Sequence, residues 1–145
     1  MLYKYMLVFV GAAIPWIEVL IVVPLGIIWG LSPIIVMLVA FLGNMATLVP
    51  VVIAFDKMKI WYVQRRREKK QPSKKSVRAV KLFQKYGVIG LAFLGPILLG
   101  THIAAFMGVA MGANRRRMLF WMAISIAIWI SLAGVLTSLG FDLFT

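Results

Sequence analysis

The sequence predicts an all-α integral membrane protein that forms a single membrane domain over residues 1–145. Its composition, with 63% hydrophobic and 14% charged residues and a mean hydropathy of +0.98, lies outside the range of soluble domains. The charge-free runs 19–55, 86–114 and 118–141 each exceed the roughly 20 residues that a helix needs to cross a bilayer. The polar stretch 56–85 is too short for a separate soluble domain, so we expect the protein to act within the membrane.

The first apolar segment, residues 5–30, is predicted to be a broken helix. Proline removes a backbone donor and glycine has low helix propensity, so a segment rich in both is a poor straight helix. The interrupting residues are Pro15, Glu18, Pro24, Gly26 and Gly30. Ser32 and Pro33 then suit the N-cap and first position of a helix, which predicts an uninterrupted spanning helix over residues 33–55.

Residues 56–86 form a basic connector between the apolar segments. It holds most of the 16 lysines and arginines and includes Arg65, Arg66 and Arg67. A net charge of +12 often indicates a nucleic-acid partner, but these charges lie beside predicted spans. We therefore expect anionic lipid headgroups as partners, no nucleic acid, and a cytoplasmic location for the connector. Apolar and basic residues alternate here at helical spacing, which predicts an amphipathic helix on the membrane surface: Val77, Val80, Phe83 and Tyr86 against Arg78, Lys81 and Lys85.

The second apolar segment, residues 87–112, is also predicted to be broken. Its glycines and proline are Gly87, Gly90, Gly95, Pro96, Gly100, Gly108 and Gly112. Asn114 suits an N-cap, and it precedes an uninterrupted helix over residues 115–141. That helix opens with Arg115, Arg116 and Arg117.

The chain therefore repeats, with a first repeat over residues 1–55 and a second over residues 87–145. Pro15, Gly26, Gly30 and Ser32 correspond to Pro96, Gly108, Gly112 and Asn114 with one inserted residue. If both broken segments crossed the bilayer fully, the arginines at 115–117 would lie outside the cell, against the positive-inside rule. Two re-entrant hairpins, 5–30 from outside and 87–112 from the cytoplasm, keep every basic cluster inside and make the halves inverted repeats. Four full crossings remain the alternative.

Re-entrant hairpins expose backbone that hydrocarbon cannot solvate, so they must be covered by protein or water. Two uninterrupted helices cover little of that backbone. We therefore expect a homodimer or larger assembly in the cell membrane.

Several motifs resemble those of a known family. They are Ile14-Pro15-Trp16-Ile17-Glu18, Val23-Pro24-Leu25-Gly26, Gly43-Asn44, Tyr86-Gly87-Val88-Ile89-Gly90-Leu91 and Pro96-Ile97-Leu98-Leu99-Gly100-Thr101. In these the chain resembles the small multidrug export proteins, a family similar to the DedA/VTT superfamily. The resemblance implies a membrane transporter, and the superfamily is associated with moving phospholipids and polyprenyl phosphate carriers between leaflets.

Two ionisable residues within the apolar segments are candidates for the transport pathway. A charged group costs about 2.5–3.5 kcal/mol at the bilayer centre, so Glu18 indicates either a proton-coupled carboxyl or a contact for a cationic group. A structural role as a helix cap is the alternative. His102 is interpreted as a proton relay or a headgroup contact, with a structural histidine as the alternative.

Further candidates surround these two residues. Pro15 and Pro24 are expected to end the limbs of the first hairpin, and Gly95, Pro96 and Gly100 to form the tip of the second, beside Thr101. Asn44 is expected to bond a hairpin carbonyl or to join a dimer face. The arginines at 65–67 and 115–117 are expected to fix topology and to form a surface for anionic lipid or lipid-linked phosphate.

The sequence argues against enzymatic chemistry. With no cysteine, one histidine and four dispersed acidic residues, we expect no metal site, no cofactor and no catalytic triad. Three functions remain: a lipid translocase of the DedA type, a proton-coupled exporter of hydrophobic cations with Glu18 as the shared carboxylate, and a non-transporting scaffold that binds anionic lipid.

Overall fold

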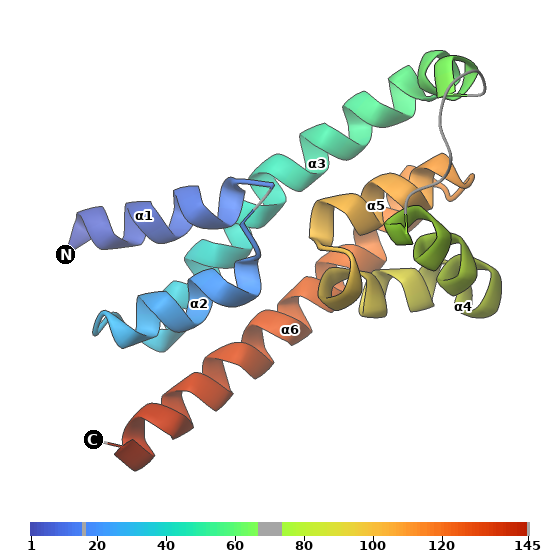
Figure 1. Ribbon diagram of the computed structural model, residues 1–145. Coiled ribbons are helices and arrows are strands. Elements are labelled where there is room, and N and C mark those ends of the chain that lie inside the picture. The colour runs from blue at the N-terminus through green and yellow to red at the C-terminus, as the bar shows by residue number, and fades with distance from the viewer. Residues whose placement is uncertain (16, 67–73, 145) are drawn as a thin grey trace. The chain divides into compact units, whose positions relative to one another are not determined.

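The computed structural model describes residues 1–15, 17–66 and 74–144, and all the regular secondary structure in these residues is helical, as predicted (Figure 1). The helices are α1 (Leu2–Ala13), α2 (Val19–Ile28), α3 (Pro33–Arg66), α4 (Lys74–Leu98), α5 (Thr101–Ala110) and α6 (Arg115–Phe144).

Two of these helices are long and apolar enough to cross a membrane. Their spanning stretches are Pro33–Met58 in α3 and Arg115–Gly140 in α6, each of 26 residues. At 1.5 Å per residue such a stretch is about 39 Å long, against a hydrocarbon core of about 30 Å. The helix α3 begins at Pro33, as predicted, but the prediction that it ends at Phe55 is wrong. It continues to Arg66 because lysine, glutamine and arginine favour helix and no proline follows before residue 72.

The first broken segment consists of two short helices. With 12 and 10 residues, α1 and α2 are about 18 and 15 Å long, so neither spans a bilayer alone. They are separated by residues 14–18 and pack side by side (Figure 1). Their contacts run antiparallel, because a Cβ on Gly11 would lie 3.4 Å from Val22 and one on Gly26 would lie 3.0 Å from Val8.

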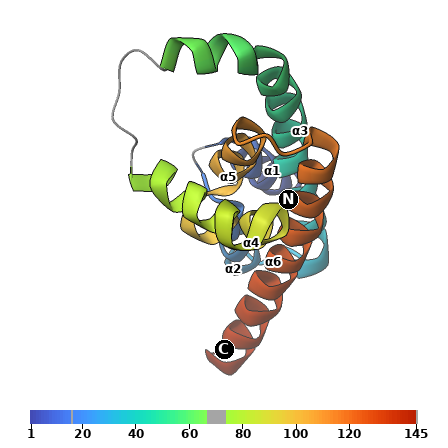
Figure 2. The same cartoon turned by 90° about the vertical axis from the view of Figure 1, so that its right-hand side faces the viewer.

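The second broken segment consists of the apolar part of α4 and of α5, which lie against each other in both views (Figures 1 and 2). This pair is antiparallel too, because Gly95 contacts Ala104 and Gly108 contacts Leu91. At Gly87 the backbone of α4 leaves helical geometry, with φ 70° and ψ −159°, a conformation open essentially to glycine. The predicted surface helix and the first limb of the second segment are therefore one element with a kink.

Both short pairs join the following long helix through the same turn. Gly30 and Gly112 adopt positive φ values of 80° and 100°, as glycines that end helices do. The turn bonds recur with an offset of 82 residues: Gly30 N to Ile27 O and Gly112 N to Val109 O, Leu31 N to Gly26 O and Ala113 N to Gly108 O, and Val36 N to Ser32 O and Met118 N to Asn114 O. The helix bounds follow the same offset, since α2 corresponds to α5 and the start of α3 to that of α6.

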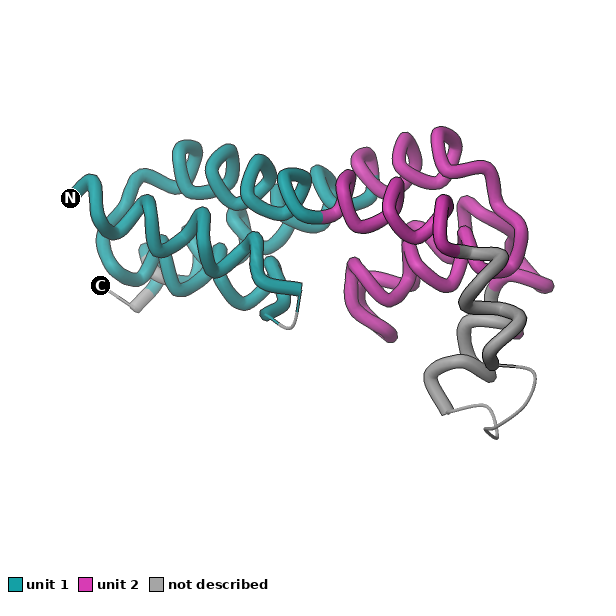
Figure 3. The backbone as a smooth tube through the Cα atoms, turned by 90° about the horizontal axis from the view of Figure 1, so that it is seen from above, with its two compact units in different colours: residues 1–47, 125–145 teal, residues 48–124 magenta. Residues whose placement is uncertain are grey.

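The chain divides into two compact units (Figure 3). Unit 1 contains residues 1–47 and 125–145, and unit 2 contains residues 48–124. Each unit therefore holds one pair of short helices and a part of each long helix. The units are not the repeats 1–55 and 87–145, because each long helix contributes to both. Unit 1 has a core around Val8, Val23 and Ala40, and unit 2 has one around Leu91, Met118 and Met122.

Candidate functional site

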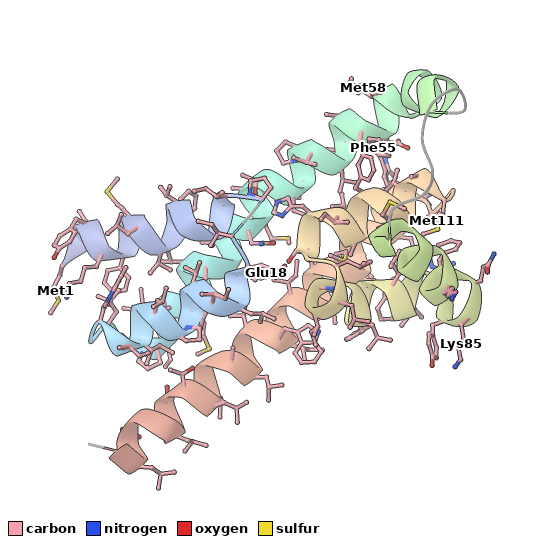
Figure 4. All side chains as sticks on the ribbon, viewed as in Figure 1. Met1, Glu18, Phe55, Met58, Lys85 and Met111 are labelled. Carbon is pink, nitrogen blue, oxygen red and sulfur yellow. The ribbon has the colours of Figure 1, made fainter. Side chains whose placement is uncertain are left out.

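In unit 1 the break between α1 and α2 places Glu18 at the start of a helix. Glu18 is the N-cap residue of α2, with φ −68° and ψ 126°, and its carbonyl accepts the amides of Ile21 and Val22. Its side chain makes no capping hydrogen bond to the helix. The half-buried carboxylate lies at the positive end of α2, where the helix dipole favours a negative charge (Figure 4).

Asn44 of α3 is bonded to the end of α1 in the same unit. Its side chain is 1% exposed, and Nδ2 donates a hydrogen bond of 3.4 Å to the carbonyl of Ala12. This carbonyl belongs to the last turn of α1, where helix carbonyls lack intrahelical partners. The next residue towards the N-terminus, Gly43, contacts the backbone of Phe9, so α1 and α3 approach closely here. Asn44 therefore links α3 to the last turn of α1, within the first broken segment.

The prolines of the first segment have different positions. Pro15 lies in the break, as expected, and is exposed. The prediction that Pro24 ends a limb is wrong, because it lies inside α2, which continues to Ile28. A proline inside a helix removes one backbone hydrogen bond and crowds the preceding turn, and the buried neighbours Val23 and Gly26 hold the helix in place.

In unit 2 the corresponding break lies at Gly100. This residue is the N-cap of α5, with φ 94° and ψ 151°, and it is followed by Thr101 and His102, whose side chains are 4% and 7% exposed. The expectation that Gly95 and Pro96 form the tip is wrong, because both belong to α4. The carbonyl of Gly95 accepts the amides of Leu99 and Gly100, so it closes the last turn before the tip.

The two breaks carry different side chains at equivalent positions. At the 82-residue offset, Glu18 and Asn44 of unit 1 correspond to Gly100 and to the buried Ile126. Conversely, Thr101 and His102 of unit 2 correspond to residues 19 and 20, which are valine and leucine. The break of unit 1 therefore offers a carboxylate and an amide, and that of unit 2 offers a hydroxyl and an imidazole.

A recess in unit 2 lies at the start of α6. Arg115 pairs with Asp56 of α3 at 3.4 Å, and the backbone amide of Arg116 donates to Asn114 Oδ1 at 2.9 Å, which confirms Asn114 as a cap. Together with Ala113 these residues line a recess of about 420 Å³. Arg117 is exposed beside it.

Some predicted site residues lie outside the described part of the chain, and the sequence did not reveal two others that the structure shows. Arg67 and the side chains of Arg65 and Arg66 lie outside the described part of the chain. Sequence reasoning missed the pairing of Asp56 with Arg115, because nothing along the chain links positions so far apart. It also missed the fully buried hydroxyl of Ser125, which a serine inside an apolar span signals. The described residues contain no group of three or more metal-ligating side chains.

Across residues 1–15, 17–66 and 74–144 the structure has two apolar helices long enough to span a membrane and four shorter ones, which defines the class as an all-helical membrane protein. Residues 18–132, more than half of the chain, match the family described as "Putative small multi-drug export protein", and the chain belongs to this family. No curated protein and no solved structure matches it.

Proposed function

We propose that this protein exports small hydrophobic cations across the cell membrane, with Glu18 as the carboxylate that binds the cation and exchanges it for a proton. The single observation that carries the proposal is the place of Glu18, a half-buried carboxylate at a helix break within apolar sequence. The other described acidic side chains, Asp56 and Asp142, lie near the ends of the spanning stretches. The family to which the chain belongs supports export as the activity.

We further propose that the two broken segments are re-entrant hairpins of an inverted repeat. The four short apolar helices, which are too short to span, support this topology, as does the recurrence of the turns with an offset of 82 residues. In transporters built from inverted repeats, the unwound backbone of broken helices lines the substrate site near the bilayer centre. The Asp56 end of α3 and the start of α6 are placed in the cytoplasm because the basic residues gather there. A homodimer would supply further cover for the hairpin backbone.

The test is transport by purified protein in liposomes. We expect a pH gradient to drive accumulation of a fluorescent lipophilic cation, and Glu18→Gln to reduce it to the level of empty liposomes, because the amide neither releases a proton nor attracts the cation. The matched control is Asp142→Asn, which neutralises an exposed carboxylate near the end of α6 and should leave transport unchanged. Full transport by Glu18→Gln would refute the role of this carboxylate.

A second candidate is lipid translocation of the DedA type. The recess of unit 2 favours it, because two arginines and a helix N-terminus line it and both attract phosphate. In the same liposomes, a translocase would equilibrate fluorescent phospholipid between leaflets without any gradient. Lipid exchange that persists in Glu18→Gln, combined with an absence of dye transport by the unmodified protein, would favour this second function.

A further inference from the structure

In the buried side-chain amide of Asn44, the nitrogen has a hydrogen-bond partner and the oxygen has none among the described residues. Nδ2 donates a hydrogen bond to the Ala12 carbonyl, whereas Oδ1 has no hydrogen-bond partner among the described residues. The residue is only 1% exposed. A buried acceptor left without a partner costs about 1–3 kcal/mol, and a lipid environment supplies no water to relieve it. A hydrogen-bond donor or a cation next to Oδ1 would offset this free-energy cost.

Packing alone does not require an asparagine here. The equivalent position of α6 is Ile126, which is 1% exposed and fills its place with an apolar side chain. At the break itself, Glu18 corresponds to Gly100, which also has no polar side chain. Glu18 and Asn44 therefore carry side-chain oxygen atoms at two positions whose counterparts, Gly100 and Ile126, carry none.

The surroundings of Asn44 are electronegative. The C-terminal end of a helix carries a partial negative charge on carbonyls that lack intrahelical partners. Asn44 lies at this end of α1, and its partner carbonyl, Ala12, is six residues before Glu18. The carbonyls of Val10 and Ala12 accept hydrogen bonds from Ile14 N and Asn44 Nδ2, and each carbonyl oxygen keeps a second lone pair that a cation can use.

We propose that the break of unit 1 binds a monovalent cation, Na⁺, through Asn44 Oδ1, carbonyl oxygens at the end of α1 and the carboxylate of Glu18. All these ligands are oxygen atoms, which suit a hard cation, and cations bind to the carbonyl ends of interrupted membrane helices. One carboxylate balances one positive charge, whereas sites for Ca²⁺ or Mg²⁺ use several acidic ligands or substrate phosphates. The site shares Glu18 with the export function proposed above, but its test measures Na⁺ binding without any cargo, so the two proposals can fail separately.

The test measures Na⁺ binding by the purified full-length protein in detergent. Thermal unfolding is followed while NaCl replaces choline chloride at constant ionic strength, and equilibrium binding of ²²Na⁺ is measured on the same sample. We expect Na⁺ to raise Tm by a few degrees in a saturable way, because a ligand that binds only the folded state stabilises it. Potassium should give a smaller shift. Absence of both a Na⁺-specific shift and ²²Na⁺ binding in the unmodified protein would overturn the proposal.

Two variants localise the site. Asn44→Leu should abolish the Na⁺-dependent shift and ²²Na⁺ binding, whereas Asn44→Asp, which keeps an oxygen at this position, should retain both. The matched control is Ser125→Ala, since Ser125 is fully buried in the same unit and its Oγ also lacks a partner among the described residues. Retention of Na⁺ binding by Asn44→Leu, or its loss in Ser125→Ala, would refute the assignment. If Asn44→Leu does not fold, loss of ²²Na⁺ binding in Glu18→Gln decides the question in its place.

Discussion

At the scale of single residues, small side chains set how closely the helices of unit 1 approach. A Cβ on Gly43 would lie 3.1 Å from the carbonyl carbon and 3.2 Å from the Cα of Phe9, so the only neighbour that could move is the backbone of α1. A similar contact exists at Gly26, but there the neighbours are the side chains of Val8 and Val36, which can rotate. Gly43 is therefore the position where even one methyl group must displace a helix.

We expect Gly43→Ala to destabilise the protein by about 1–3 kcal/mol, the usual cost of forcing extra volume into a packed core. Displacement of α1 would also lengthen the bond between Asn44 and Ala12, which is already 3.4 Å. The measurement is thermal or denaturant unfolding in detergent. Gly140→Ala is the control, because no atom lies within 4 Å of its Cβ position and alanine favours helix. Equal stability of the two variants would contradict the close contact.

Sequence reasoning identified some of these residues and missed others for a physical reason. Glu18, Asn44 and His102 stood out because a polar group within an apolar run is costly wherever it packs, so the chain alone reveals it. The pairing of Arg115 with Asp56 depends on which helices meet, and no local pattern encodes that. The contact of Gly43 with Phe9 is hidden for the same reason, because glycine has many uses in membrane helices.

At the scale of elements, the sequence predicted where helices start better than where they end. Pro33 and Arg115 begin long helices as expected, because the residues before them, Ser32 and Asn114, suit an N-cap. The prediction that α3 ends at Phe55 was wrong because loss of hydrophobicity does not stop a helix, and α3 continues to Arg66. Pro24 and Pro96 were expected at breaks but lie within helices, and the actual break of unit 2 lies at Gly100, where the backbone needs a conformation that only glycine adopts readily.

We therefore expect Gly100→Ala to disturb the turn between α4 and α5. With φ 94° and ψ 151°, this position lies in a region that costs other residues about 1–3 kcal/mol. The strain should lower the Tm measured in detergent, and it should act on Thr101 and His102, which start α5. The control is Gly140→Ala, because the φ of Gly140 is not positive and no atom lies within 4 Å of its Cβ position. A Tm for Gly100→Ala that equals the control would show that the turn relaxes without strain.

At the scale of the whole molecule, the two units are built from corresponding parts of the chain. Unit 1 combines the first pair of short helices with the start of α3 and the end of α6, and unit 2 combines the second pair with the end of α3 and the start of α6. A shift of 82 residues carries residues 1–47 of unit 1 onto 83–129, most of which lie in unit 2. Such an exchange of halves is what an inverted repeat requires, and it supports the proposed topology over four full crossings.

The absence of native cysteine allows this topology to be tested directly, with single cysteines at Ser32 and Asn114. These residues occupy equivalent positions before α3 and α6, both are exposed, and both are close to a helix start, so their intrinsic reactivity is matched. With re-entrant hairpins, a membrane-impermeant maleimide applied to intact cells should label position 32 and spare position 114 until the membrane is permeabilised. With four full crossings, both positions would lie outside the cell and react equally.

A third cysteine at Asp142 separates the two topologies again, because the end of α6 lies outside in the first case and in the cytoplasm in the second. Labelling of all three positions from one side only would contradict both arrangements, since α6 could not then cross the membrane.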